Sequence, residues 1–332
     1  MLRAAIIGLG EISNIHLPVL LESVNMDLAA VCDIDPAMAA KAPGTKFYTG
    51  YREMLAAERL DCVHICLPHY LHYPVARYVI EQGVNVFCEK PLAMNLAEAR
   101  DFVALEESHP ELKIGICFQN RYNESFQMLM HLVAEGQMGR VTGIKGIVPW
   151  FRALSYYTDK PWRMRMSTAG GGVMINQSIH TMDLMQLIGG EIASIRGSIA
   201  NLLDYDGLEV EDTASARMEF KNGAQGFFFA TTANSRNDSV EIEVTLEQGE
   251  LILRDCCLYR QNDGVLEQLV EDDRLAGTKF YFGASHGKII RQFYECLETG
   301  SHEYVHARDA LTSMRMIDAI RRSSEGKVSI AF

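Results

Sequence analysis

The first 120 residues alternate short apolar runs with stretches that have a helical period. The apolar runs are predicted strands, at 4–8, 28–33, 62–67, 84–88 and 112–118. The stretches between them are predicted helices, at 12–22, 36–41, 51–58, 74–82 and 96–108. Continuously apolar strands separated by helices are typical of a parallel sheet covered on both faces. The pattern predicts a doubly wound α/β domain, and Pro18 predicts a kink or a later start in the first helix.

After residue 120 the pattern changes to a helix, a strand, an irregular stretch and then several strands in succession. The helix is predicted at 124–135, the irregular stretch at 149–169, and a second helix ends at 188. The later strands are predicted at 192–200, 213–220, 224–231, 239–246 and 250–253, and two closing helices at 288–298 and 307–323. The dipeptides Asn222-Gly223 and Gln248-Gly249 predict hairpin turns, so this sheet is expected to be mostly antiparallel and open. We therefore expect two packed domains, 1–120 and 121–332.

Composition and charge narrow the functional classes. The chain of 332 residues has 48% hydrophobic and 22% charged residues, which is typical of a folded protein with a large core. Its formal net charge is −12, and without a basic run it lacks the surface that nucleic-acid binding requires. No apolar window approaches the roughly 18 residues of a membrane span, and the N-terminus lacks a signal-peptide pattern. We expect a cytoplasmic protein that binds neither nucleic acid nor membrane.

Eight cysteines and several histidines raise the question of a metal site. The segment Cys62, His64, Cys66, His69 and His72 offers possible ligands. Its first three members alternate along a predicted strand, whereas tetrahedral metal sites usually take ligands from a turn, and no cysteine pair has the two-residue gap of a zinc knuckle. Reduced thiols in an apolar core are the favoured interpretation, and no metal is expected.

The sequence GLGEIS at 8–13 joins the first predicted strand to the first helix. In a dinucleotide-binding fold Gly8 would form the tight turn and Gly10 would let the backbone approach the pyrophosphate. Glu11 and Ile12 would then begin the helix whose amides face the phosphates, with Ser13 at the third small position. The alternative is an ordinary strand-to-helix turn, but the surrounding strand and helix favour the cofactor.

Asp33 ends the second predicted strand, 25 residues after Gly8. A carboxylate at this place can accept hydrogen bonds from the ribose hydroxyls of NAD. It would repel the 2′-phosphate of NADP, and neither Ile34 nor Asp35 offers a cation. NAD is therefore expected, with NADP the less favoured cofactor.

The sequence CEKP at 88–91 ends the fifth predicted strand. Ligands in open α/β sheets bind beyond the carboxyl ends of the strands, so Lys90 is predicted to face the cofactor. Its ammonium group could hold a substrate hydroxyl or take part in proton transfer, and Pro91 restricts its backbone. A solvated lysine at a strand end is an equal alternative.

Three glycines at 170–172 precede a helical pattern that carries Asn176, His180 and Asp183. The spacing of four and then three residues predicts that these side chains lie near one helical face. His180 could then act as the general base that takes a hydroxyl proton while hydride leaves the same carbon. Taken alone, a packing histidine whose ring bonds Asn176 is the more common arrangement.

The irregular stretch is a candidate substrate-binding segment. Aromatic rings suit the apolar face of a sugar, and guanidinium groups suit carboxylates or phosphates. The residues that offer these groups are Arg152, Tyr157, Trp162 and Arg163. The alternative is a packed loop with surface arginines.

These motifs together resemble one family, the Gfo/Idh/MocA oxidoreductases. The matching features are GLGEIS at 8–13, Asp33, CLPHYLH at 66–72, CEKP at 88–91, NRY at 120–122, WR at 162–163, and GGGVMINQSIH at 170–180 with Asp183. The resemblance implies a Rossmann domain, followed by an α/β domain whose open sheet lies partly against a neighbouring subunit. It also implies that the last helix returns to pack near the first domain. Because an open antiparallel sheet needs a cover, we expect a homodimer or homotetramer.

The resemblance also implies roles for particular residues. Lys90 would contact the nicotinamide ribose and the substrate, and His180 would be the acid/base residue. Residues implied near the dinucleotide are Leu67, Pro68 and Glu89 in its cleft, and Asn120 and Arg121 at the nicotinamide end. Many members carry Asp where this chain has Asn176, and an amide stabilises an imidazolium less than a carboxylate does. His180 is therefore expected to be a weaker base, with Asn176 beside it in the catalytic set.

The resulting hypothesis is a NAD(P)-dependent dehydrogenase, NAD being preferred, that transfers hydride between the nicotinamide and a hydroxyl of a sugar, sugar acid or inositol. Two alternatives follow from the same resemblance. One is a glycosidase that uses bound NAD for transient oxidation. The other is a regulator that binds NAD without catalysis.

Overall fold

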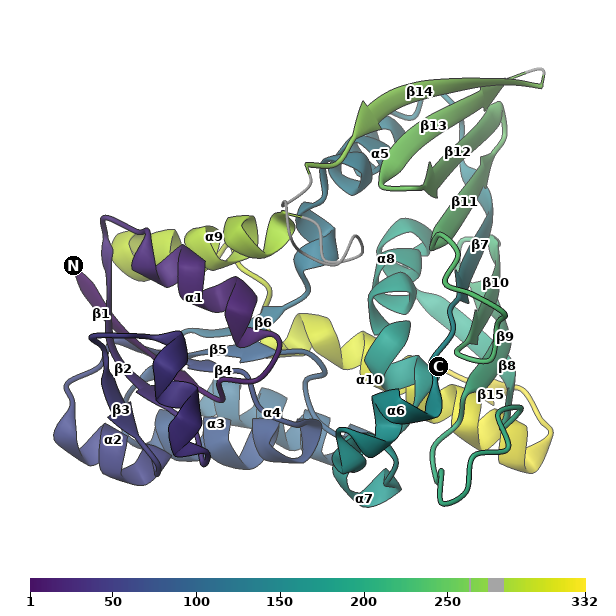
Figure 1. Ribbon diagram of the computed structural model, residues 1–332. Helices are drawn as coiled ribbons and strands as arrows, with labels where there is room; N and C mark the ends of the chain where they lie inside the picture. The colour runs from purple at the N-terminus through teal and green to yellow at the C-terminus, as the bar shows by residue number, and fades with distance from the viewer. Residues whose placement is uncertain (263, 274–283) are drawn as a thin grey trace. The chain divides into compact units, whose positions relative to one another are not determined.

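The computed structural model describes residues 1–262, 264–273 and 284–332, which form two compact units (Figure 1). The first unit comprises Met1–Phe118 and His286–Leu311, and the second comprises Gln119–Ser285 and Thr312–Phe332. A segment from near the end of the chain thus completes the first unit. Within the described ranges, every helix is too short or too polar to cross a bilayer.

The first unit contains a parallel sheet in the strand order β3-β2-β1-β4-β5-β6. Its strands are β1 (Leu2–Ile7), β2 (Met26–Cys32), β3 (Lys46–Tyr48), β4 (Cys62–Ile65), β5 (Asn85–Glu89) and β6 (Ile114–Cys117). The predicted doubly wound fold is confirmed, and five of its strands were predicted. The missed strand, β3, has only three residues, too few for an apolar pattern to stand out. The strand order reverses between β1 and β4, and ligands of such sheets bind at the carboxyl ends of strands at this point.

Helices cover both faces of this sheet, α1 and α9 on one and α2, α3 and α4 on the other (Figure 1). The helical segments of this unit include α1 (Ser13–Leu21), η1 (Pro36–Lys41), α2 (Tyr51–Ala57), η2 (His69–Leu71), α3 (His72–Glu81), α4 (Leu96–Ser108) and α9 (Ser285–Thr299). Helix α1 begins at Ser13 and includes Pro18, so the prediction of a later start is wrong. Phe293 of α9 packs on Phe87 of β5, with ring centroids 5.3 Å apart. A Cβ on Gly115 of β6 would lie 2.6 Å from Phe293, so this strand needs a glycine where α9 crosses it.

The second unit is built on a nine-stranded sheet in the order β14-β13-β12-β11-β7-β10-β9-β8-β15. Its strands are β7 (Val141–Pro149), β8 (Ile192–Ala200), β9 (Thr213–Phe220), β10 (Gln225–Thr231), β11 (Glu241–Leu246), β12 (Gly249–Arg254), β13 (Cys257–Asn262), β14 (Val265–Glu271) and β15 (Ile330–Ala331). Neighbouring strands are antiparallel except for β7 and β10, which are parallel. The predicted mostly antiparallel sheet is confirmed, as are the hairpins β9–β10 and β11–β12. The sequence did not predict β13, β14 or β15.

Helices pack on one face of the second sheet. The helical segments are η3 (Gln119–Tyr122), α5 (Glu124–Glu135), α6 (Leu154–Thr158), η4 (Pro161–Arg163), α7 (Met166–Ala169), a π-helix η5 (Val173–Gln177), α8 (Ile179–Gly189) and α10 (Ala307–Gly326). Helix α8 lies close to β7, where a Cβ on Gly146 would be 2.4 Å from the sulfur of Met185. On the opposite face side chains such as Arg217 and Phe227 are exposed, and Phe227 keeps 53% of its surface accessible.

Candidate functional site

The turn after β1 has the shape that a dinucleotide fold requires. Gly8 has φ +94°, and a Cβ there would lie 2.5 Å from the carbonyl oxygen of Cys66, just beyond β4. Only glycine fits this position, because both the backbone conformation and the close approach exclude a side chain. Gly10 is exposed, and a Cβ there would meet nothing within 4 Å. The turn therefore leaves open space where the sequence predicted the pyrophosphate.

Asp33 joins this turn to the end of β2. One carboxylate oxygen accepts a hydrogen bond from the amide of Leu9 at 2.7 Å, and the other from the amide of Asp35 at 3.0 Å. A carboxylate has about four acceptor sites, so Asp33 retains capacity for ribose hydroxyls. Lys41, which sequence reasoning did not consider, donates to the carbonyl of Gly10 at 3.1 Å. It places a cation beside the turn from the end of η1, a short helix that carries no motif.

The residues of this turn fit NAD. Open space lies over Gly10, the first turn of α1 follows without a side-chain cap at Ile12, and Glu11 between them is exposed. A helix N-terminus attracts phosphate through its amides and its dipole. Asp33 offers a carboxylate at the end of β2, so the predicted glycine turn and its acidic residue lie together in the first unit, whereas Asn120 and Arg121 lie in the second unit.

His72 connects the two loops that follow β4 and β5. Its Nδ1 lies 2.7 Å from the carbonyl oxygen of Pro91, and its Nε2 lies 2.7 Å from that of Leu67, next to Pro68. The ring is buried, and burial lowers the pKa of His72 although both carbonyls favour the protonated ring. This bridge sets the spacing of the loops that carry Leu67 and Lys90, both expected at the cofactor.

The residues of segment 62–72 that were considered as metal ligands lie in different secondary-structure elements. Cys62 and His64 lie in β4, His69 lies in η2, and His72 begins α3. His64 is bonded to His16 at 2.8 Å and to Tyr294 at 3.0 Å. All eight cysteines lie among the described residues and are free thiols, seven of them buried. The segment is thus part of the packed core of the first unit.

In the second unit, His180 lies in the first turn of α8. Its Nε2 lies 3.4 Å from the side-chain nitrogen of Gln119, a buried residue that opens η3. Asn176 lies in the π-helix η5, which ends before α8 begins, with Ser178 between them at φ −109° and ψ 4°. Asn176 and His180 therefore lie in two successive helical segments, because the backbone changes conformation between them. That their side chains lie near one face stays a prediction.

Tyr156 of α6 contacts the η5 turn instead. Its hydroxyl oxygen accepts hydrogen bonds from Asn176 at 2.9 Å and from Gln177 at 3.0 Å. The neighbouring Tyr157 is buried, and its hydroxyl lies 3.1 Å from that of Thr232. Consecutive residues of a helix point about 100° apart, so only one of two adjacent tyrosines can face the turn. Sequence reasoning chose Tyr157 and missed Tyr156.

Two arginines of the candidate substrate segment gather around the ring of Tyr156. The guanidinium carbon of Arg163 lies 4.1 Å from the ring centroid, and that of Arg152 lies 5.2 Å from it. Arg163 also lies 5.6 Å from the ring of Trp162 in the same short helix, η4. Arg152 donates to the side chain of Asn237 at 2.8 Å. The structure thus groups Arg152, Trp162 and Arg163 with Tyr156, beside Asn176.

Arg121 and Asp183 form a buried ion pair in the second unit. Two hydrogen bonds of 2.7 and 2.6 Å join the guanidinium to the carboxylate, and the side chains are 13% and 1% exposed. This pairing links η3, which contains Asn120 and Arg121, to α8, which contains His180. Both oxygens of Asp183 thus accept hydrogen bonds from Arg121, a contact that neither sequence position indicated.

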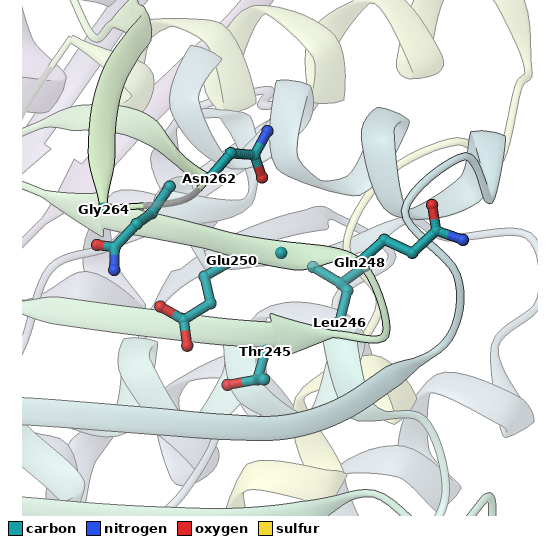
Figure 2. Close-up of a pocket in the computed structure, with 8 residues that line it drawn as sticks. Thr245, Leu246, Gln248, Glu250, Asn262 and Gly264 are labelled. Atoms are coloured by element: carbon teal, nitrogen blue, oxygen red, sulfur yellow. The ribbon is translucent and has the colours of Figure 1, made fainter.

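A pocket in the second unit lies apart from the predicted residues (Figure 2). It lies along β11, β12 and β13 and is lined by Thr245, Leu246, Gln248, Gly249, Glu250, Gln261, Asn262 and Gly264. Among these residues only Glu250 carries a charge, and Figure 2 shows its carboxylate at the edge of a strand. A single carboxylate provides no acid/base pair, so we do not assign chemistry to this pocket.

Comparison with known protein families identifies the same two parts of the chain, an N-terminal dinucleotide-binding domain and a C-terminal domain. Residues 2–114 match the family described as "Oxidoreductase family, NAD-binding Rossmann fold", and residues 126–252 match the "GFO/IDH/MocA C-terminal domain". The chain belongs to the Gfo/Idh/MocA oxidoreductase family. Its first domain is of the NAD-binding type, which confirms the cofactor prediction made from Gly8, Gly10 and Asp33.

Proteins similar to this chain are named as oxidoreductases or dehydrogenases. The uncharacterized oxidoreductase YrbE of Bacillus subtilis is 26% identical over 70% of this chain and 66% of its own length, just under two thirds. The myo-inositol 2-dehydrogenase of Thermotoga maritima is 24% identical over 99% of this chain and 98% of its own. The WlbA dehydrogenase of Bordetella pertussis, solved with NADH and UDP-GlcNAcA, has a TM-score of 0.87 and 24% identity, covering 100% of this chain and 98% of its own. The last comparison establishes the fold.

Proposed function

We propose that this protein is a NAD-dependent dehydrogenase that transfers hydride between the nicotinamide and a hydroxyl of a sugar, sugar acid or inositol. The observation that carries the proposal is the dinucleotide turn of Gly8, Gly10 and Asp33, in the same unit as Lys90 at the end of β5. NAD, when bound, supplies the hydride acceptor. NADP is the less favoured cofactor, because Asp33 would repel its 2′-phosphate.

Lys90 and His180 are proposed to act on the same substrate hydroxyl. The ammonium group of Lys90 would hold the oxygen and stabilise negative charge that develops there. The imidazole of His180 would take the hydroxyl proton as general base, which requires a neutral ring with a free lone pair. Asn176, next to Tyr156, would hold substrate without adding the negative charge that would strengthen the base.

The cluster around Tyr156 supports a polyhydroxy substrate. Arg152, Trp162 and Arg163 combine aromatic faces with guanidinium groups, which suit a sugar ring and an acidic substituent. A myo-inositol dehydrogenase and a dehydrogenase solved with a nucleotide sugar acid among the relatives support the same range of substrates.

A panel of polyols, sugars, sugar acids and nucleotide sugars with NAD or NADP tests the proposal, read by absorbance of the reduced cofactor. We expect turnover with NAD that falls by about 10²–10⁴-fold in His180→Ala, the usual contribution of a general base. Full turnover in that variant would remove His180 from the mechanism. Cleavage of a glycoside without accumulation of NADH would instead support the glycosidase alternative. NAD binding without turnover on any substrate would support the regulator.

We also propose a cytoplasmic homodimer or homotetramer. Eight reduced thiols are typical of a reducing compartment. The open face of the second sheet exposes Phe227, and sheet faces of this kind are usually covered by a partner. Light scattering on the purified protein would measure its mass, and a monomer at micromolar concentration would contradict this assembly.

A further inference from the structure

A buried chain of hydrogen bonds runs through the core of the first unit and ends next to Lys90. Oε1 of Glu89 lies 2.9 Å from Nε2 of His16, and Nδ1 of His16 lies 2.8 Å from Nδ1 of His64. Nε2 of His64 then lies 3.0 Å from the hydroxyl of Tyr294 on α9. The four side chains come from β5, α1, β4 and α9, and each residue is at most 5% exposed.

Hydrogen-bond chemistry fixes the protons in this chain when both rings are neutral. An ionised carboxylate only accepts, so Nε2 of His16 donates to Glu89. Nδ1 of His16 is then an acceptor, and the proton between the two rings belongs to Nδ1 of His64. Nε2 of His64 in turn accepts from the hydroxyl of Tyr294. Each of the three hydrogen bonds then contains one proton, and in each bond the donor group lies farther along the chain from Glu89 than the acceptor does.

The ionisation behaviour of these groups agrees with this direction. Burial, with a further contribution from His16, holds the pKa of His64 well below its usual value, so the ring is neutral. Burial by itself would raise the pKa of Glu89, but the hydrogen bond from His16 and the nearby His286 and Lys90 lower it overall. Burial and the charge of Glu89 raise the pKa of the Cys117 thiol, which stays protonated and hydrogen bonds to that carboxylate.

Glu89 is therefore a buried anion directly before Lys90 in the chain. The titratable groups around it are His16 from α1, His286 from α9 and Lys90 itself, and His72 from α3 also interacts with it electrostatically. A neighbouring anion favours the protonated form of a lysine. Loss of the His16 hydrogen bond would make the ionised carboxylate unfavourable in this core, and Glu89 would then take up a proton.

We propose that His16 is a positioning residue that acts on Lys90 through Glu89: the proton that it donates to Glu89 keeps this carboxylate ionised, and the carboxylate keeps Lys90 charged for its contact with the substrate. The substrate part of this inference rests on the proposed function. Because His16 lies in α1, the helix that follows the Gly8–Gly10 turn, the same hydrogen bond joins this helix to β5, the strand that Lys90 directly follows.

A metal ion is the competing explanation for this cluster. Ligand atoms of His16, Glu89 and Cys117 lie within 4.8 Å of one another. Metal binding would require Nε2 of His16 and the thiol of Cys117 to lose their protons, whereas both are donors to Glu89 in the chain described above. Metal analysis of the purified protein should find less than a tenth of an equivalent of zinc or iron, and one equivalent would overturn the proposal.

The decisive experiment measures the titration of Lys90 directly and requires no substrate. Protein with 13Cε-labelled lysine, saturated with NADH, is titrated by NMR, and Lys90→Arg identifies the signal. Three variants are compared with the wild type: His16→Leu removes the donor, His16→Gln restores an amide donor, and Glu89→Gln removes the charge. Tyr294→Phe is the matched control, because it removes a buried hydroxyl from the far end of the same chain.

We expect the pKa of Lys90 to fall by about one unit or more in His16→Leu and Glu89→Gln, the usual effect of removing a nearby opposite charge. It should recover in His16→Gln and stay at the wild-type value in Tyr294→Phe. An unchanged Lys90 titration in folded Glu89→Gln, or in folded His16→Leu, would overturn the proposal. Because the titration does not depend on turnover, it tests the role of His16 separately from the proposed dehydrogenase activity. If His16→Leu does not fold, Glu89→Gln decides.

Discussion

Replacing Asp183 by Asn tests whether the buried ion pair with Arg121 holds the second unit together. The substitution keeps the shape of the side chain but removes its charge, and it turns one acceptor toward Arg121 into a donor. One N–H of the guanidinium then faces an NH2 group in place of an oxygen, and the guanidinium loses the compensating negative charge in a site where the two partners are 13% and 1% exposed.

The expected cost follows from this burial. Removing one partner of a buried, bidentate pair leaves an uncompensated charge and typically costs about 3–5 kcal/mol. Exposed pairs are worth about 1 kcal/mol or less. The matched control is Glu191→Gln, because Glu191 pairs with Lys221 in the same unit while the two side chains are 77% and 60% exposed. Asp183→Asn should therefore lower stability several times more than Glu191→Gln does.

The assay uses the two tryptophans of the chain, Trp150 and Trp162, which both lie in the second unit. Their fluorescence during urea unfolding reports this unit separately, which matters because a protein of two units need not unfold in one step. A double-mutant cycle with Arg121→Gln should return a coupling of about 0.5–3 kcal/mol. Equal midpoints for Asp183→Asn and Glu191→Gln would show that the pair contributes little and refute the reasoning.

Three further outcomes are expected in the first unit. Gly10→Ala should leave the melting temperature unchanged, because its Cβ enters open space, but it should weaken NADH binding in a fluorescence titration. Gly8→Ala should weaken binding and also destabilise the unit by about 1–3 kcal/mol, because its Cβ would meet the carbonyl of Cys66. Equal losses of stability in the two variants would contradict this. Asp33→Ala should lower the preference for NAD over NADP, measured as the ratio of dissociation constants, and an unchanged ratio would show that Asp33 does not select the cofactor. Burial lowers the pKa of His64, so the unfolded chain binds this proton before the folded protein does as the pH falls below about 6.5. The free energy of unfolding, followed by circular dichroism, should therefore drop there by up to about 1.4 kcal/mol per pH unit, and less steeply in His64→Gln. Identical slopes in the two proteins would refute this.

Several features of the candidate site could be predicted because they depend on residues close together in the chain. The turn at Gly8 requires a residue that tolerates positive φ, and Asp33 follows at the end of the next strand. Lys90 follows β5 directly, so its place at the carboxyl end of a strand was known once the strand was recognised. The helix that carries His180 was likewise predicted, although the π-helix before it was not.

Other contacts join residues that are distant in sequence, and no local pattern indicates them. Tyr156 meets Asn176 across 20 residues, and Arg121 meets Asp183 across 62. The bond between His16 and Glu89 spans 73 residues and depends on how α1 packs against β5. Residue types alone did not distinguish Tyr156 from Tyr157, because the rotation of the short helix α6 decides which ring faces the turn.

The sequence by itself determined the alternation of strands and helices, the glycine turn, the carboxylate for ribose and, through these, the family of NAD-binding oxidoreductases. All of these depend on backbone geometry and hydrophobic period over a few neighbouring residues. Only the tertiary structure decided the order of the nine strands, the parallel pairing of β7 with β10, and the partners of the buried charges. The physical reason is that pairing and burial are settled by packing of the whole unit, where a charge is stable only beside the group that compensates it.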